Sequence, residues 1–599
     1  MMSQYIAPLQ DMEFVLRELA GLDAVAALPG NEELSSELAS AILEEAGRFA
    51  SGVLSPLNVV GDRQGARWQD GEVHTAPGWR EAYRQFSEAG WNGLSCNSEF
   101  GGQGLPRLLS ALVEEMWNGA NVAFALCPML TRGAIEALEL CGSAQQKSTY
   151  LPRLISGEWT GTMNLTEPQA GSDLSAVRTR AVPQGDGSFR LHGQKIFITY
   201  GEHDIAGNIV HLVLARTPNA PEGVKGISLF LVPKFLVNPD GSLGARNDVR
   251  CVSIEHKLGI HGSPTAVLAF GDNDGAIGWL VGEENRGLEY MFIMMNAARF
   301  SVGLEGVGLC ERAYQRARDY ARERRQGTEI GSRSRDKVAI IRHPDVRRML
   351  LQMKSRTEAL RAVACVVAAA SELAHGHRDE AVRRENQAFV DLMIPVVKGW
   401  STESAVLVTS LGVQIHGGMG YIEETGAAQH LRDARITPIY EGTTGIQAAD
   451  LVGRKIARDG GQAIGAVLRQ MGTVRAQLAE SDDVNLEAIA QRLQAAISAL
   501  RDAVDFVVAK QGSEAPLAAA GAVPLLELFG IATGGWQLGR AALAAHRLLQ
   551  DGSGAGDFLK AKQLTARFYA DHVLSAAPGL AQAVLHGGGA TLDYPDDAF

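Results

Sequence analysis

The spacing of apolar residues changes twice along this chain of 599 residues. In the first part apolar residues recur every three or four positions, which predicts helices at Ala39–Phe49, Trp79–Ala89 and Leu109–Ala120, and Leu138–Gly157 closes this helical part. From about residue 159 the spacing shortens to two, which predicts strands at Phe189–Thr199, Ile209–Ala215, Ile227–Val232, Ala266–Phe270 and Ile277–Val281. After Gly282 the helical spacing returns. A chain that alternates in this way is too long for one core and should divide into three or four domains.

We predict an α+β protein with four parts. These are an N-terminal helical domain over 1–158, a central antiparallel β-barrel over 159–283, a helical bundle over 284–459 and an additional C-terminal helical domain over 462–599. For the central part a small sandwich is the alternative, because several short strands without a long helix suit both architectures. The last part is alanine-rich and carries no motif, so we interpret it as structural.

Composition excludes several classes of function. The net charge of −12 argues against nucleic acid as the main partner, because binding phosphates needs a basic surface. The six cysteines have no metal-ligand spacing and are expected to be reduced, mostly buried thiols. The first 14 residues lack the apolar segment of a signal peptide, and no stretch reaches the ~20 apolar residues of a membrane span. We therefore expect a soluble, cytoplasmic protein.

One carboxylate stands at a break in regular structure. Glu441 lies between Pro438 and Gly442, beside a Gly-Thr-Thr-Gly turn, and a helix is predicted from Ile446 to Ala457. Apolar neighbours suggest that Glu441 is partly buried, which would raise its proton affinity and make it a stronger base toward carbon acids. The alternative is an acid at a helix N-terminus that only stabilises the helix.

A second segment combines hydroxyl groups with a turn. Residues 163–173 read Met-Asn-Leu-Thr-Glu-Pro-Gln-Ala-Gly-Ser-Asp, in which Thr166 and Ser172 offer hydroxyls and Gly171 lets the backbone approach a ligand. The strand end Phe197-Ile198-Thr199 adds an aromatic face and another hydroxyl. Neutral donors around an aromatic ring suit a flavin better than a free phosphate, and a simple capped loop is the alternative.

Three motifs together resemble those of the flavin-dependent acyl-CoA dehydrogenases. They are Thr166-Glu167-Pro168 with Ala170-Gly171-Ser172-Asp173, the loop Gln414-Ile415-His416-Gly417-Gly418-Met419-Gly420-Tyr421, and Ile439-Tyr440-Glu441-Gly442-Thr443. Their order and spacing match over residues 80 to 455, and the additional C-terminal part resembles the long, four-domain branch of the family. The resemblance implies that FAD is the cofactor and an acyl-CoA thioester the substrate. Within this branch 3-methylmercaptopropionyl-CoA or a short to medium fatty acyl-CoA is the expected substrate.

The resemblance also implies roles for individual residues. Glu441 would remove the α-proton while the β-hydrogen leaves as hydride to the flavin. The residues expected to contact FAD are Leu165, Thr166, Ser172, Phe197, Thr199, Arg324, Gln414, Gly418 and Thr443, of which Arg324, Gln414 and Gly418 would reach the FAD of a neighbouring subunit. The residues expected to contact acyl-CoA are Ser172, Asn296, Arg299, Tyr440 and Gly442. For Arg299 the alternative is an ordinary surface ion pair, and His416 is expected to be a packed, hydrogen-bonded histidine and not a catalyst.

Partners follow from the same resemblance. We expect a homodimer, and an electron-transfer flavoprotein that accepts the electrons. Two alternatives remain open at this stage. An acyl-CoA oxidase that uses O₂ has the same fold, and rapid reoxidation of the reduced enzyme by air would favour it. A DNA-binding alkylation-response flavoprotein is less expected, because the chain is acidic and retains Glu441.

Overall fold

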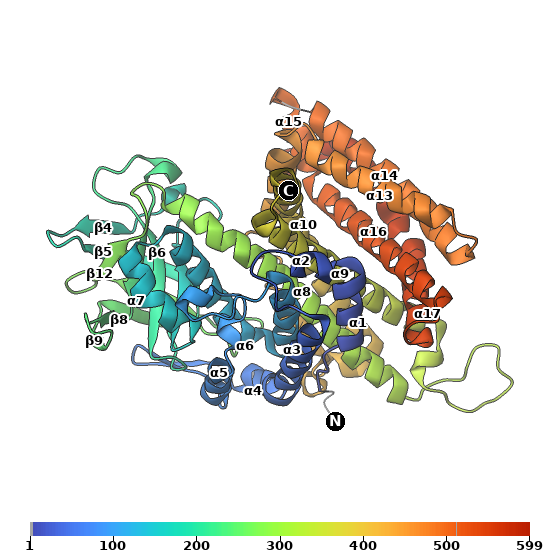
Figure 1. The fold of residues 1–599 in the computed structure, drawn as a ribbon, viewed down its shortest axis with the longest axis horizontal. Helices are drawn as coiled ribbons and strands as arrows, with labels where there is room; N and C mark the ends of the chain where they lie inside the picture. The colour runs from blue at the N-terminus through green and yellow to red at the C-terminus, as the bar shows by residue number, and fades with distance from the viewer. Residues whose placement is uncertain (1–3, 511) are drawn as a thin grey trace. The chain divides into compact units, whose positions relative to one another are not determined.

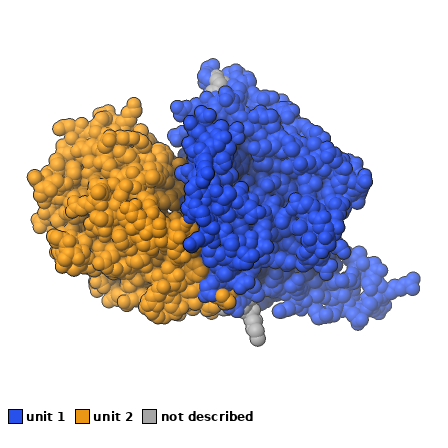
Figure 2. Space-filling view, in the orientation of Figure 1, with its two compact units in different colours: residues 1–47, 106–119, 302–599 blue, residues 48–105, 120–301 orange. Residues whose placement is uncertain are grey.

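The computed structural model describes residues 4–510 and 512–599, which pack into two compact units. Unit 1 contains residues up to 47, 106–119 and 302–599, and unit 2 contains 48–105 and 120–301 (Figure 2). Three helices belong to both units: α3 (Ser36–Phe49), α6 (Arg107–Cys141) and α8 (Gly287–Glu323). The four domains predicted from the sequence stay a prediction. The two units are defined by packing, and each combines segments that are far apart in the chain.

Unit 2 is built on a sheet with helices around it. Its further helices are α4 (Ser55–Gln64), α5 (Trp79–Glu88) and α7 (Ala144–Ile155). Its strands are β1 (Arg67–Gln69), β2 (Glu72–His74), β3 (Trp159–Asn164), β4 (Arg180–Pro183), β5 (Phe189–Thr199), β6 (Asn208–Ala215), β7 (Ser228–Pro233), β8 (Phe235–Val237), β9 (Leu243–Arg246), β10 (Val249–Ile254), β11 (Thr265–Phe270) and β12 (Ala276–Leu280). The predicted strand at 189–199 coincides with β5, and the others agree within a residue or two.

The prediction of an antiparallel β-barrel was wrong in two respects. The main sheet runs in the order β10-β11-β5-β12-β7-β6-β3, with β4 paired to β5, and β3 and β10 do not pair to close it. In addition, β3 and β6 are parallel, with Trp159 opposite Asn208 and Asn164 opposite Val213. The central part is therefore an open, mixed sheet, with a core that includes Leu191, Phe230 and Phe270.

Other groups occupy the edges that a barrel would have joined. At β3 the Gly161 N–H donates to Thr131 Oγ1 of α6 (3.1 Å), so a helix side chain replaces the next strand. At β10 the Trp68 Nε1–H of the β1–β2 hairpin donates to the carbonyl of Cys251 (3.1 Å). Since unpaired edge groups need partners, these contacts satisfy part of each edge without closure of the sheet.

Unit 1 is helical. Besides its parts of α3, α6 and α8, its helices are α1 (Leu9–Phe14), α2 (Leu22–Ala26), α9 (Pro344–Gly376), α10 (Glu380–His416), α11 (Ala427–Ala434), α12 (Thr444–Asp450), α13 (Gln462–Ala479), α14 (Val484–Ala509), α15 (Ala515–Ala520), α16 (Ala522–Gln550), α17 (Gly556–His572) and α18 (Ala577–Asp593). Helices α13, α14, α16 and α17 lie side by side (Figure 1), and α16 also packs against α9 and α10. The C-terminal helices are therefore packed onto the bundle that contains Glu441.

A buried network of charges joins distant segments of unit 1. Arg361 of α9 contacts Asp11, Glu115 (2.5 Å) and Glu311 (2.8 Å), although only 1% of its side chain is exposed. Lys562 of α17 contacts the same Asp11 and also Glu358, at 2.8 Å. Burial by itself would raise the pKa of Asp11, but the Lys562 and Arg361 cations hold it well below its usual range. The network thus ties the N-terminal segment and the C-terminal helices to α8 and α9.

Two other expectations concern the cysteines and the membrane. All six cysteines are free thiols and five are buried, as predicted. Within the described residues, α9 alone is long and apolar enough to cross a membrane, and the bent pair Gly512–Ala520 with Ala522–Gln550 passes the same test together. In α9, 61% of that apolar window is buried inside the protein, as is usual for a core helix.

Candidate active site

Glu441 lies in a strained turn between α11 and α12. Its φ is +53°, a left-handed conformation that costs a residue with a side chain about 1–3 kcal/mol, and Gly442 follows with φ +89°. Such a conformation persists only where its surroundings impose it. Glu441 is half-buried, as its apolar neighbours suggested.

Two buried side chains hold the backbone of this turn. Lys398 of α10, which is fully buried, donates from Nζ to the carbonyls of Thr437 (2.8 Å) and Gly442 (2.7 Å). Gln447 of α12, also fully buried, donates from Nε2 to the carbonyls of Glu441 (3.1 Å) and Gly442 (3.3 Å). The carbonyls on both sides of Glu441 are therefore fixed from two helices.

Tyr440 connects the turn to a third helix. Its hydroxyl donates to Oε2 of Glu305 on α8, a carboxyl group that is only 1% exposed. Burial raises the pKa of Glu305 to about 8, against the lowering effect of the Tyr440 hydrogen bond. The two carboxyl groups nearby, Glu114 and Glu441, raise it further. The predicted contact of Tyr440 with the thioester stays a prediction.

The residues after Glu441 begin the next helix. Thr443 is the N-cap of α12, because its Oγ1 accepts from the N–H of Ile446 (3.3 Å). Thr444 donates from Oγ1 to Glu403 of α10 (2.6 Å). Glu441 therefore precedes the helix, and Thr443 supplies the cap.

The three residues expected to reach a neighbouring subunit's FAD lie at or just beyond the ends of α8 and α10. Tyr320, one turn before Arg324, stacks on His416 with ring centroids 4.3 Å apart. His416 lies between Gln414 and Gly418, so the ends of α8 and α10 meet here. Arg324, Gln414 and Gly418 are all exposed. His416 is buried and its Nδ1 faces the Gly412 carbonyl at 2.7 Å, which confirms the prediction of a packed histidine.

In unit 2 the loop that follows β3 is fixed against β5. The Ile196 N–H donates to the Thr166 carbonyl (2.9 Å), and Lys195 donates from Nζ to the Leu165 carbonyl (3.0 Å). Lys195 also pairs with Glu167 at 2.8 Å, and both side chains are buried. Burial alone would raise the pKa of Glu167, but the Lys195 charge and hydrogen bonds lower it to about 2. Burial lowers the pKa of Lys195 to about 8, against the effect of Glu167, which still favours the ion pair at neutral pH.

The predicted flavin residues of unit 2 lie on two segments, 165–172 and 197–199, which are joined by the hydrogen bond between Thr166 and Ile196. Phe197 follows Lys195 and Ile196, is 59% exposed and has φ +59°, which is rare for an aromatic residue. Thr166 and Thr199 are half-buried, and Ser172 is exposed. An exposed aromatic ring held in a strained backbone next to hydroxyl groups fits a flat, conjugated cofactor such as a flavin.

Asn296 and Arg299 lie one turn apart on α8. Arg299 is 7% exposed and donates from Nη1 to Asn296 Oδ1 (3.4 Å). Its burial disagrees with the alternative of a surface ion pair. Their predicted contact with CoA stays a prediction.

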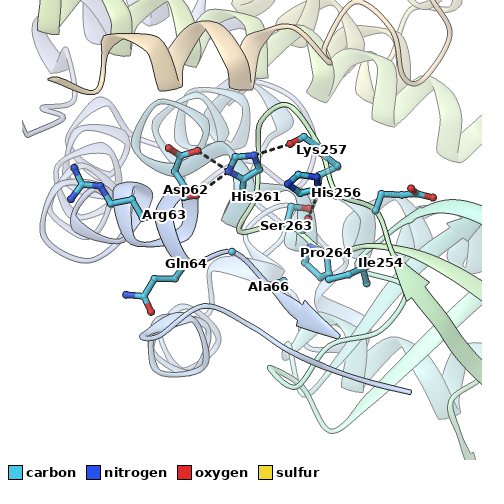
Figure 3. A pocket seen from close by; sticks show the side chains of 12 residues that line it. Asp62, Arg63, Gln64, Ala66, Ile254, His256, Lys257, His261, Ser263 and Pro264 are labelled. Carbon is cyan, nitrogen blue, oxygen red and sulfur yellow. Dashed lines mark hydrogen bonds and ion pairs between the residues drawn. The ribbon is translucent and has the colours of Figure 1, made fainter. Parts of the chain in front are cut away.

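A pocket in unit 2 contains none of the predicted residues. It lies between the end of α4 and the loop before β11 (Figure 3) and is lined by Asp62, Arg63, Gln64, Gly65, Ala66, Ile254, Glu255, His256, Lys257, His261, Ser263 and Pro264. His261 bridges its two sides, with Nδ1 facing the Asp62 carbonyl (2.9 Å) and Nε2 the Lys257 carbonyl (2.8 Å). We interpret these contacts as structural. Within residues 4–510 and 512–599 no cluster of His, Cys, Asp or Glu could hold a metal ion.

Sequence reasoning missed the side chains that support the site. Lys398, Glu305 and Lys195 are each buried, and none of them belongs to a recognised motif. A signal was present for two of them. Lys398 stands alone in the apolar stretch Ile394–Trp400, and Glu305 stands alone between Phe300 and Cys310. A single charge in an apolar helical run indicates a buried group that needs a specific partner.

Comparison with known families accounts for most of the chain. Residues 36–158, 162–273 and 285–456 match the models for the N-terminal, middle and C-terminal domains of acyl-CoA dehydrogenase. Residues 468–595 match the model described as acetyl-CoA dehydrogenase C-terminal like.

Individual relatives match over nearly their whole length. The chain is 51% identical to 3-methylmercaptopropionyl-CoA dehydrogenase of Ruegeria pomeroyi, over 95% of this chain and 96% of the relative. It is 35% identical to a butyryl-CoA dehydrogenase of Syntrophomonas wolfei, over 99% of both chains. A crystal structure of acyl-CoA dehydrogenase complexed with FAD from Bacillus anthracis has the same fold, with a TM-score of 0.74 at 22% identity, over 98% of this chain and 93% of that one.

Proposed function

Since the chain belongs to the acyl-CoA dehydrogenase family, we propose that it oxidises a short acyl-CoA thioester to the trans-2-enoyl-CoA. The enzyme is FAD-dependent, and the cofactor supplies the hydride acceptor that no side chain can provide. The Glu441 carboxylate would take the α-proton of the substrate, and bound FAD would supply the acceptor for the β-hydrogen.

The observation that carries this proposal is the fixed turn around Glu441. A thioester α-proton is very weakly acidic, so its removal requires a carboxylate held close to the α-carbon. Lys398 and Gln447 restrain the carbonyls next to Glu441, and the φ of +53° shows that the turn is held against its local preference. A base that is already positioned avoids the entropic cost of finding its reactive geometry.

The residues proposed to hold FAD fall into two sets. Leu165, Thr166, Ser172, Phe197 and Thr199 would line the flavin, and Arg324, Gln414 and Gly418 would contact the FAD of a neighbouring subunit. Thr443 is a further proposed FAD contact. The rigid loop at Glu167 and the exposed ring of Phe197 support the first set. The exposure of Arg324, Gln414 and Gly418 at the adjoining ends of α8 and α10 supports the second.

For the acyl group we propose 3-methylmercaptopropionyl-CoA, with short linear acyl-CoA as the nearest alternative. The names of the two relatives, 3-methylmercaptopropionyl-CoA dehydrogenase and butyryl-CoA dehydrogenase, support this choice, because both substrates have short chains. Asn296, Arg299, Ser172, Tyr440 and Gly442 would contact the CoA ester. Steady-state kinetics over a series of acyl-CoA esters, with an artificial electron acceptor, measures the preference directly. A maximum at a long-chain ester would contradict the choice of substrate.

We also propose an electron-transfer flavoprotein as the electron acceptor. Stopped-flow reoxidation of the substrate-reduced enzyme distinguishes this from the oxidase alternative. Slow reoxidation by air and rapid reoxidation by electron-transfer flavoprotein are expected, and rapid reoxidation by air would reject a dehydrogenase that depends on a protein acceptor.

Replacement of the base tests the reaction itself. The Glu441→Gln variant should retain FAD and acyl-CoA binding, while kcat falls by about 10²–10⁴-fold, because a neutral amide cannot accept the proton. Flavin absorbance gives the cofactor content, and a titration with acyl-CoA gives binding. Glu480→Gln, the same change at an exposed position, is the matched control. Near-normal turnover of Glu441→Gln would show that another group is the base.

A further inference from the structure

The carboxyl group of Glu305 is buried beside the proposed base and has one hydrogen-bond partner among the described residues. Its Oε2 accepts from the Tyr440 hydroxyl, and its Oε1 is buried without a partner. A buried carboxylate normally requires a paired cation or several donors. Glu305 has neither within the described part of the chain.

The charges around Glu305 also disfavour its ionised form. Glu114 of α6 and Glu441 act against a negative charge at this position, and Lys398 of α10 acts in its favour. Lys398, however, directs its ammonium to the carbonyls of Thr437 and Gly442. Two carboxyl groups and one cation that is engaged elsewhere leave the neutral acid as the favoured state.

The connection to the base runs through one residue. Tyr440 precedes Glu441 directly, and burial raises the pKa of its phenol well above the ordinary value, so it remains a hydrogen-bond donor. With its hydroxyl held by Glu305, the Tyr440 ring cannot rotate freely. The peptide that joins it to Glu441 is thereby restrained from α8, in addition to the contacts from Lys398 and Gln447.

We propose that Glu305 is a positioning residue that, as a neutral carboxylic acid, holds Tyr440 and through it the turn that carries Glu441. This inference rests on the proposed function, since it concerns the same base. A neutral partner meets two requirements together: it accepts the Tyr440 hydroxyl, and it adds no second negative charge next to the carboxylate that must remove a proton.

Infrared spectroscopy tests the protonation state without reference to activity. The difference spectrum between wild type and Glu305→Gln at pH 7 should contain the C=O stretch of a protonated carboxyl group, and this band should disappear from wild type as the pH rises above about 8. Glu385→Gln, the same change at an exposed position of α10, should lack the band. If only a carboxylate band is lost in Glu305→Gln, the proposal is wrong.

Kinetics test the positioning role. Glu305→Leu removes the acceptor and should lower kcat/KM by about 10- to 100-fold with KM little changed, because a small displacement of a catalytic group is costly. Glu305→Gln, which keeps a neutral acceptor, should recover most of that loss. Tyr440→Phe should behave like Glu305→Leu, and the double variant should be no worse than either single one. Fully additive losses, or a Gln variant as impaired as Leu, would overturn the proposal.

These outcomes are separable from failure of the proposed function. If wild type did not oxidise any acyl-CoA, or if Glu441→Gln remained active, the reaction or the base would be misassigned, but the infrared band would still report the state of Glu305. If Glu305→Leu failed to fold, the Gln variant and Tyr440→Phe would still decide the matter.

Discussion

Lys398 offers the sharpest test of how this fold positions its base. The change is Lys398→Met, which keeps an unbranched side chain of similar length and removes the ammonium. Two hydrogen bonds are lost, to the carbonyls of Thr437 at 2.8 Å and Gly442 at 2.7 Å. Hydrogen bonds from a charged group contribute about 1.5–3 kcal/mol each, so the restraint removed is about 3–6 kcal/mol.

This restraint should be compared with the strain that it opposes. Glu441 with φ +53° stores about 1–3 kcal/mol of backbone strain. The lost hydrogen bonds exceed that strain, so the turn should relax in Lys398→Met even though Gln447 is still present. Since a displacement of about 1 Å can cost about 100-fold in rate, we expect kcat to fall by about that factor.

The assay is steady-state kcat with acyl-CoA and an artificial acceptor, together with flavin absorbance and thermal unfolding. Lys560→Met, at an exposed position of α17, is the matched control and should leave kcat unchanged. A Lys398→Met variant that binds FAD and keeps kcat within about threefold of wild type, a difference below 1 kcal/mol, would refute the claim that Lys398 holds the turn.

Two further predictions concern the architecture around the site. Lys562→Met should destabilise unit 1 by about 3–5 kcal/mol, because Asp11 and Glu358 would lose a buried cation. Lys560→Met, on the same helix, is the control and should not destabilise it. Urea unfolding of both variants measures the difference, and equal midpoints would contradict the reasoning. If the FAD site is completed by Arg324, Gln414 and Gly418 of a second copy, the active species in sedimentation velocity with activity detection should be a homodimer, and an active monomer would reject the shared site.

Local patterns predicted most of the elements, because a helix or strand leaves its period in the sequence. The predicted helix at Trp79–Ala89, for example, became α5 (Trp79–Glu88). Closure of the sheet could not be predicted in this way. The sheet stays open, and groups from distant parts of the chain bond to its two edge strands. These are Thr131 of α6 at β3 and Trp68 of the β1–β2 hairpin at β10.

The same distinction applies to the site. Motifs revealed residues expected to contact a ligand, because those residues are close together in sequence, as in Tyr440-Glu441-Gly442. The groups that hold them are far away along the chain. Glu305 precedes Tyr440 by 135 residues, and Lys398 precedes Gly442 by 44. Their partners are backbone carbonyls and a hydroxyl, so no complementary pair of charged letters marks these contacts in the sequence.

The position of Glu441 is consequently a property of the packing of three helices and not of its own loop. Glu305 acts from α8, Lys398 from α10 and Gln447 from α12, and all three side chains are buried. Helix α10 packs against α12, and α16 of the C-terminal part packs against both. A shift of α16 would therefore be transmitted to the two helices that hold the carbonyls of the turn. We therefore predict that the C-terminal helices, although they carry no motif, support catalysis by keeping α10 and α12 at the spacing that the strained conformation of Glu441 requires.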